Sequence, residues 1–78
     1  MKELAFADLY QSAAISLLLN LPPGFRAENG KTLFTFPRNE ALYKALDDYN
    51  SGVSLPALDY AYRIKRLRAE MLIRRGQR

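Results

Sequence analysis

The spacing of apolar side chains predicts three helices and one β-hairpin along the chain. From residue 8 to about residue 21, apolar side chains recur every three or four positions over a wide surface, as in a helix that is buried on more than one side. Asp8 can cap the start of this helix, and Pro22-Pro23-Gly24 ends it. Its apolar rows are Leu9, Ala13 and Leu17, and Tyr10, Ala14, Leu18 and Leu21.

Residues 25–36 are expected to form the hairpin. Asn29-Gly30 favours a two-residue type I′ turn, because both residues tolerate positive φ angles. This turn places Glu28 opposite Lys31 as a pair of opposite charges. The other expected pairs are Ala27 with Thr32, Arg26 with Leu33 and Phe25 with Phe34. The face expected to join the core carries Phe25, Ala27, Phe34 and Phe36.

Two further helices are expected, over residues 40–51 and about 55–75. Asn39 is a suitable N-cap for the first, and Ser54 for the second. The expected core stripe of the second helix is Ala57, Tyr60, Ala61, Ile64, Leu67 and Met71. Residues 76–78 are expected to fray.

These elements predict a small two-layer α+β fold of order α-β-β-α-α, with helices packed on the phenylalanine face of the hairpin. The length of 78 residues fits one domain, so residues 1–78 are expected to form a single unit. Both edges of the hairpin are unaccounted for in this arrangement. A homodimer that joins two hairpins into a four-stranded sheet therefore stays open.

Short motifs follow one another in a characteristic order from Phe6 to about Ile73. They are Ala7-Asp8-Leu9-Tyr10, Gly24-Phe25, Phe34-Thr35-Phe36, the Leu42, Leu46 and Tyr49 spacing with Asn50-Ser51-Gly52 after it, and the Tyr60 to Arg68 stretch. In this order the chain resembles a family of short prokaryotic and phage-associated proteins known only as a domain of unknown function. It departs from the family at Ala7, where members carry a threonine cap. The resemblance supports the fold and implies no activity and no site residues.

The charge of the chain is concentrated at one end. Through Tyr62 there are five basic and seven acidic side chains, whereas from Arg63 onward there are seven basic side chains and one acidic one. The first part thus carries −2 and the second +6, within a net charge of +4. The last predicted helix should therefore have one core face and one basic face.

Several kinds of chemistry lack the side chains that they need. The chain has no cysteine and no histidine, so it offers no thiolate ligand, no disulfide and no imidazole base. Its serines have no conventional base, and its four glycines are too dispersed for a phosphate-binding loop. Asp47 and Asp48 diverge by about 100° on a helix and are expected on a solvated face. We expect no catalytic residues, no metal and no cofactor, and hence no enzyme.

Nothing in the sequence indicates a membrane partner. The longest apolar run, Ile15 to Leu19, is far shorter than a membrane span, and the N-terminal residues do not resemble a signal peptide. The basic helix also lacks the Trp and Phe face of a typical membrane binder. We expect a cytoplasmic location.

The basic helix is the strongest candidate for a binding site. Its cations could contact nucleic-acid phosphates without reading bases, or the carboxylates of an acidic protein, or they could form only a solvated face. The sequence therefore favours a non-catalytic binding or adaptor module, with protein–protein interaction or self-association through the hairpin edge as the alternative. The candidate residues are Tyr62, Arg63, Lys65, Arg66, Arg74 and Arg75.

Overall fold

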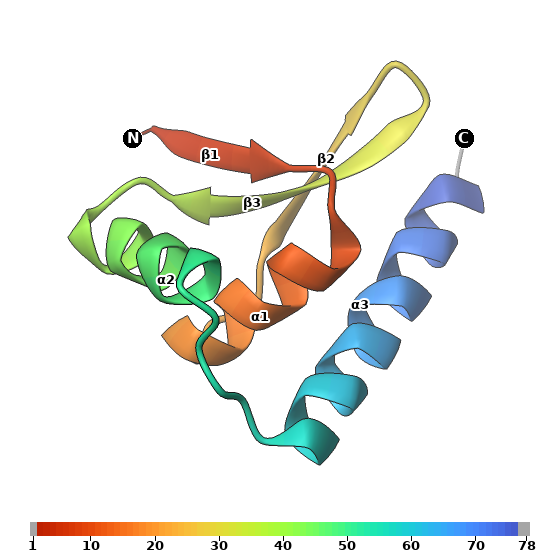
Figure 1. Ribbon diagram of the computed structural model, residues 1–78. Coiled ribbons are helices and arrows are strands. Elements are labelled where there is room, and N and C mark those ends of the chain that lie inside the picture. The colour runs from red at the N-terminus through yellow and green to blue at the C-terminus, as the bar shows by residue number, and fades with distance from the viewer. Residues whose placement is uncertain (1, 77–78) are drawn as a thin grey trace.

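The computed structural model describes residues 2–76 of the chain, and the side chains of residues 2–74. It contains β1 (Glu3–Phe6), α1 (Leu9–Leu19), β2 (Gly24–Glu28), β3 (Lys31–Pro37), α2 (Glu40–Asn50) and α3 (Ala57–Gly76). All three helices lie on one side of the sheet (Figure 1). The α+β class predicted from the sequence is confirmed, whereas the predicted order is wrong because it omits β1.

The sheet is antiparallel and has the strand order β1-β3-β2, so β3 is central. The short strand β1 places Leu4 opposite Phe36 and Phe6 opposite Phe34. Four residues give too short an alternation to be recognised as a strand in the sequence. Because β1 covers the free side of β3, two hairpins cannot join there into a four-stranded sheet.

The hairpin has the predicted turn and register. Asn29 has a φ angle of 52° and Gly30 one of 77°, as a type I′ turn requires, and all four predicted cross-strand pairs are present. Phe34 and Phe36 are fully buried. Ala27, which was expected in the core, is exposed, because the tip of the hairpin extends beyond the helices (Figure 1).

The helix α1 is the most enclosed element. Its residues 12–16 are all fully buried, and it packs against α2, α3 and the sheet. The Asp8 carboxylate caps its N-terminus by accepting from the amides of Tyr10 and Gln11. Asn20 ends it in the left-handed conformation, two residues earlier than the prolines suggested.

The two later helices differ in how well the sequence located them. Asn39 caps α2 as predicted, since its side chain accepts from the amide of Leu42. Ser54 does not cap α3: the Tyr60 amide donates to the carbonyl of Pro56, and the helix begins at Ala57. The helix continues through Gly76, and residues 77 and 78 of the expected frayed tail lie outside the described residues.

Only part of the predicted stripe of α3 reaches the core. Tyr60, Ile64, Leu67 and Met71 pack there, whereas Ala57 and Ala61 are exposed. The core centres on Ala13, Ile15, Phe34, Phe36, Leu42, Ala45 and Leu67.

Substituting Gly24 tests the packing of the sheet. A Cβ at this position would lie 2.5 Å from Oγ1 of the buried Thr35, so that one of the two must move. Overpacking costs about 1–3 kcal/mol, whereas removing a strand glycine gains about 0.5–1 kcal/mol. We therefore expect Gly24→Ala to lower the free energy of unfolding in urea by about 1 kcal/mol.

The same substitution made in a Thr35→Ala background should cost little. A stability loss that is equal in both backgrounds would show that the contact between residues 24 and 35 is not its cause.

Substituting Tyr60 tests a link between α3 and α1. Its hydroxyl donates to the carbonyl of Tyr10 at 3.0 Å, and burial, with smaller contributions from Tyr49, Asp8 and Tyr10, raises its pKa above the ordinary 10.0. The unfolded chain therefore loses this proton first as the pH rises. The resulting stability is complete below about pH 10 and is lost as the pH rises through the higher folded pKa.

We expect Tyr60→Phe to lose about 1 kcal/mol at neutral pH and to show a shallower decline in stability above pH 10 than the parent protein. Urea unfolding followed by circular dichroism up to about pH 11 measures both. Parallel declines in the two proteins would contradict the assignment of the alkaline effect to Tyr60.

Candidate functional site

The basic side chains of α3 do not form one face. Arg63, Arg66 and Arg74 line a groove on one flank of the helix. On another side, Arg68 donates from Nη2 to the hydroxyl of Tyr10 at 3.1 Å. Lys65 is exposed and lies outside the groove. It comes two positions after Arg63, which rotates it by more than half a helical turn away from the Arg63 side of α3. The expectation of a single basic face is therefore wrong.

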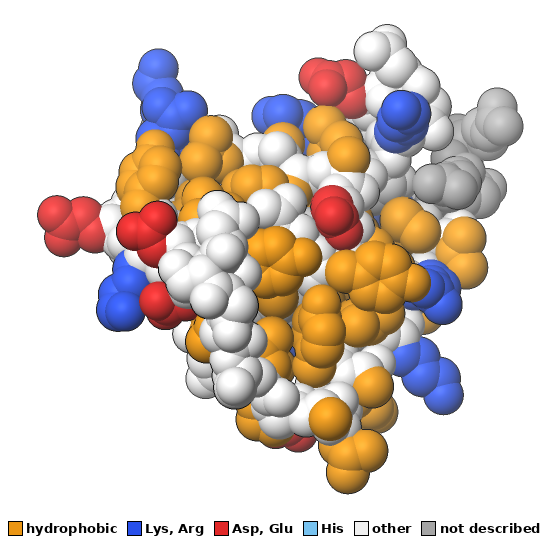
Figure 2. Space-filling model, viewed as in Figure 1, with side chains coloured by type: hydrophobic (Ala, Val, Ile, Leu, Met, Phe, Trp, Pro, Cys, Tyr) orange, Lys and Arg blue, Asp and Glu red, His pale blue; other side chains and the backbone are white. Residues whose placement is uncertain are grey.

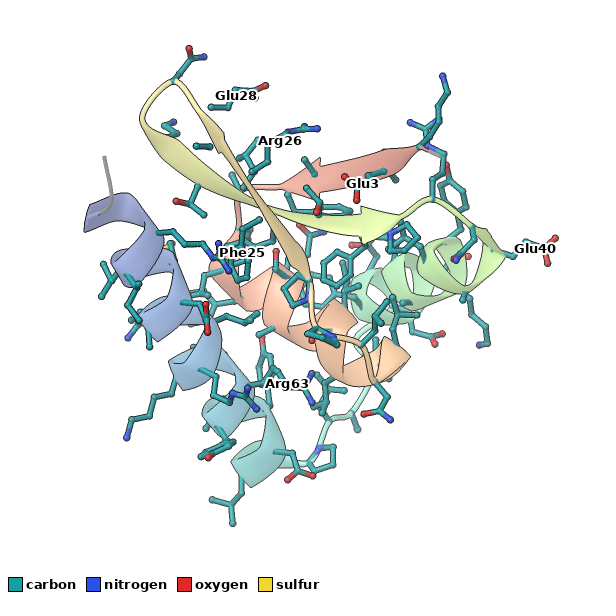
Figure 3. All side chains as sticks on the ribbon, turned by 180° about the vertical axis from the view of Figure 1, so that it is seen from behind. Glu3, Phe25, Arg26, Glu28, Glu40 and Arg63 are labelled. Atoms are coloured by element: carbon teal, nitrogen blue, oxygen red, sulfur yellow. The ribbon has the colours of Figure 1, made fainter. Side chains whose placement is uncertain are left out.

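The groove has a volume of about 320 Å³. It lies between α3, the C-terminal end of α1, the loop through Pro22 and Pro23, and the start of β2. Phe25 of β2 and Arg63 of α3, both labelled in Figure 3, belong to its walls. Leu21 and Leu67 add apolar surface, so the groove combines an apolar lining with cations.

Arg63 joins α3 to the end of α1. Its Nη1 donates to the hydroxyl of Ser16 at 2.6 Å and to the Ser16 carbonyl at 3.4 Å. The Ser16 hydroxyl donates in turn to the carbonyl of Leu21 at 2.7 Å. A cation is favourable here because the last carbonyls of a helix carry partial negative charge. Arg63 therefore has a structural role through Nη1, and only the other nitrogens of its guanidinium are left to bind a ligand.

Arg74 covers the aromatic wall of the groove. Its guanidinium carbon lies 4.2 Å from the centre of the Phe25 ring, a cation–π contact, and its Nη2 lies 3.6 Å from Oε1 of Glu70. The Phe25 ring packs on Phe34 with 5.6 Å between ring centres. Arg74 is thus held over a ring that is anchored in the core, while about half of its side chain stays exposed.

Arg66 is the most available of the three arginines. It is exposed and has no hydrogen bond or ion pair to the described side chains. Tyr62, one turn earlier, is 66% exposed. Arg75 was also a candidate, but its side chain lies outside the described residues.

Sequence reasoning missed the groove itself. Ser16 and Asn20 come from α1 and its cap, and Phe25 was assigned only to the core. Ser16 is 47 residues from Arg63 in the chain, and nothing local in either segment indicates that they meet. The concentration of arginines after residue 62 was the available signal, and it identified only the α3 side.

The described residues show neither a metal cluster nor a membrane span. Within residues 2–76, no three His, Cys, Asp or Glu side chains gather where they could hold an ion. None of the helices described is long and apolar enough to cross a bilayer.

Comparison with known proteins gives no relative: no family model, no curated protein and no solved structure matches the chain. The resemblance to a family known only as a domain of unknown function stays a prediction.

Removing the Arg63 side chain tests its structural role. Arg63→Ala deletes charge-assisted hydrogen bonds to Ser16, each of a kind that contributes about 1.5–3 kcal/mol. We expect urea unfolding to show a loss in that range. Lys65→Ala removes a neighbouring exposed cation and should change stability by less than about 0.5 kcal/mol. Equal losses of stability in the two variants would contradict a stabilising role of the hydrogen bonds between Arg63 and Ser16.

Proposed function

We propose that the protein is a non-catalytic module that binds nucleic-acid phosphates through the groove beside α3. The observation that carries this proposal is the gathering of Arg63, Arg66 and Arg74 on one groove that has a single acidic side chain, Glu70. Arginine suits phosphate because its planar guanidinium offers several donors at once. The groove therefore has the charge and the donor type of a phosphate-binding surface.

The dimensions of the groove favour a single strand over a duplex. Arg74 lies eleven positions after Arg63, which corresponds to about 16 Å along a helix. That distance can follow several successive phosphates of one strand. A hollow of about 320 Å³ accommodates one backbone more readily than a double helix.

The residues would have different roles in such a complex. Arg66 would contact phosphate directly, since it has no competing partner among the described side chains. Arg74 would share its charge with Glu70 and Phe25. The exposed ring of Tyr62 would offer a stacking surface that does not distinguish between bases. Lys65 and Arg75 would add positive charge.

A second candidate function is the binding of an acidic protein. The outward side of α3 exposes large apolar side chains, Leu58, Tyr62, Leu72 and Ile73. Figure 2 shows hydrophobic side chains gathered at the lower right, where α3 lies, with Lys and Arg beside them. Apolar and aromatic groups bordered by arginine are typical of protein interfaces. A cytoplasmic location, expected from the sequence, stays a prediction.

Titration of labelled single-stranded and double-stranded oligonucleotides at about 50 and 200 mM salt tests the main proposal. We expect tighter binding of the single strand and a steep loss of affinity with salt. Arg66→Gln and Arg74→Gln should each weaken binding equally for all sequences and lower the salt slope by about 0.7.

Arg38→Gln is the matched control, because it removes the same charge from an exposed position that does not line the groove. It should leave the slope unchanged. Absence of binding at low salt would contradict the proposal and favour the acidic protein partner. An equal effect of Arg38→Gln would show that only net charge matters.

A further inference from the structure

The strand β2 forms an uncovered edge of the sheet. It pairs with β3 on one side, and its other side has no neighbouring strand among the described residues. Gly24, Arg26, Ala27 and Glu28 are all exposed. An exposed edge offers free amide and carbonyl groups to another strand.

The turn determines which backbone groups of β2 are free. In a hairpin closed by a two-residue turn, the pair that flanks the turn, here Glu28 with Lys31, exchanges both hydrogen bonds, and bonded pairs then alternate with non-bonded ones. Arg26 and Leu33 are therefore the next bonded pair. The amide and carbonyl of Ala27 must then point away from β3, toward the open edge.

The opposite side of β3 supports this assignment independently. The amide of Arg38 donates to the carbonyl of Lys2 at 3.0 Å, in register with the pairing of β1 and β3. Even-numbered residues of β3 thus bond toward β1, and odd-numbered ones toward β2.

We propose that two copies of the chain pair antiparallel through β2, with Ala27 on the two-fold axis, and so form one continuous sheet of six strands. In this register the two Ala27 residues exchange both backbone hydrogen bonds. Arg26 lies opposite Glu28 of the second copy, and Glu28 opposite its Arg26. These are non-bonded pairs, in which the side chains approach most closely, with Cα atoms about 4.5 Å apart.

Charge selects this register over its neighbours. Sliding the strands by two residues in one direction places Arg26 on the axis, opposite Arg26 of the second copy. Sliding them in the other direction places Glu28 opposite Glu28. Like charges directly opposite one another destabilise a sheet, so only the register centred on Ala27 satisfies both charged side chains.

The side chains also leave room for this pairing. Arg26 and Glu28 lie on the face of the sheet away from the helices, so their contacts are not obstructed by α1 or α3 (Figure 3). Ala27, on the opposite face, is small and lies beyond the helices at the hairpin tip. Neither Arg26, Ala27 nor Glu28 lines the groove, so the dimer does not rest on the proposed function.

A charge exchange tests the register. Sedimentation of the full chain over a concentration series should show a reversible dimer. Arg26→Glu and Glu28→Arg each make both cross pairs alike in charge and should weaken the dimer at least about tenfold. The double variant Arg26→Glu/Glu28→Arg restores opposite charges and should recover the dimer.

The double variant has an internal control. It loses the intrachain pair of Glu28 with Lys31 just as the single Glu28→Arg variant does, so the two differ in the contact between copies. A parent protein that is monomeric at every concentration, or a double variant as weak as the single variants, would overturn the proposal.

Backbone substitutions test the edge itself. Ala27→Pro removes an outward amide and no hydrogen bond to β3, so the fold should persist while the dimer dissociates. Ala5→Pro is the matched control on β1, where the amide of the residue opposite Thr35 also faces away from β3. It should leave the dimer intact. Dissociation by Ala5→Pro but not by Ala27→Pro would assign the interface to β1 and overturn the proposal.

Discussion

The helix α1 is enclosed by the sheet on one side and by α2 and α3 on its flanks, and the other elements are arranged around it (Figure 1). Five consecutive residues of this helix, 12–16, are fully buried. Four of them are Ser or Ala, and their small size lets neighbouring helices approach closely. The packing is tight enough to bury the Ser12 hydroxyl without a hydrogen-bond partner among the described residues. Burying an unpaired hydroxyl costs free energy, so close packing outweighs that penalty here.

The groove lies beside α3, between the C-terminal end of α1 and the start of β2. The helix α3 has 20 residues and α1 has 11, so α3 extends beyond its contact with α1. Its arginines reach the start of β2 instead, where Arg74 lies over Phe25. A charged side chain is suited to this position, because its aliphatic stem can cover the ring while its guanidinium stays in water.

Local sequence signals predicted the elements correctly at turns and helix caps, where a few neighbouring residues determine the backbone conformation. The turn at Asn29 and Gly30 fixed the register of the hairpin, and Asp8 and Asn39 both cap helices as expected. Residues whose environment depends on distant segments were harder to predict. Ala27 shares a strand face with core residues yet lies beyond the helices that could bury it.

The strand β1 and the groove could not be predicted for the same reason. β1 is held in place by pairing with β3, which lies about 30 residues later in the chain. The four residues of β1 carry no local pattern from which this pairing could be predicted. The basic segment was recognised from composition alone. Its division among a groove, a contact with Tyr10 and open solvent depends on how α3 is oriented against α1.

The contacts between α1 and α3 also bear on how the protein folds during translation. Tyr60 and Arg68 reach Tyr10 across 50 and 58 residues, and Arg63 reaches Ser16 across 47. The ribosome therefore releases α1, the sheet and α2 before the helix that covers the remaining flank of α1. Until then, a largely apolar helix stays open to solvent and to other nascent chains. The arrival of α3 completes the core, so the same segment that carries most of the positive charge also ends the period in which the chain is most prone to aggregate.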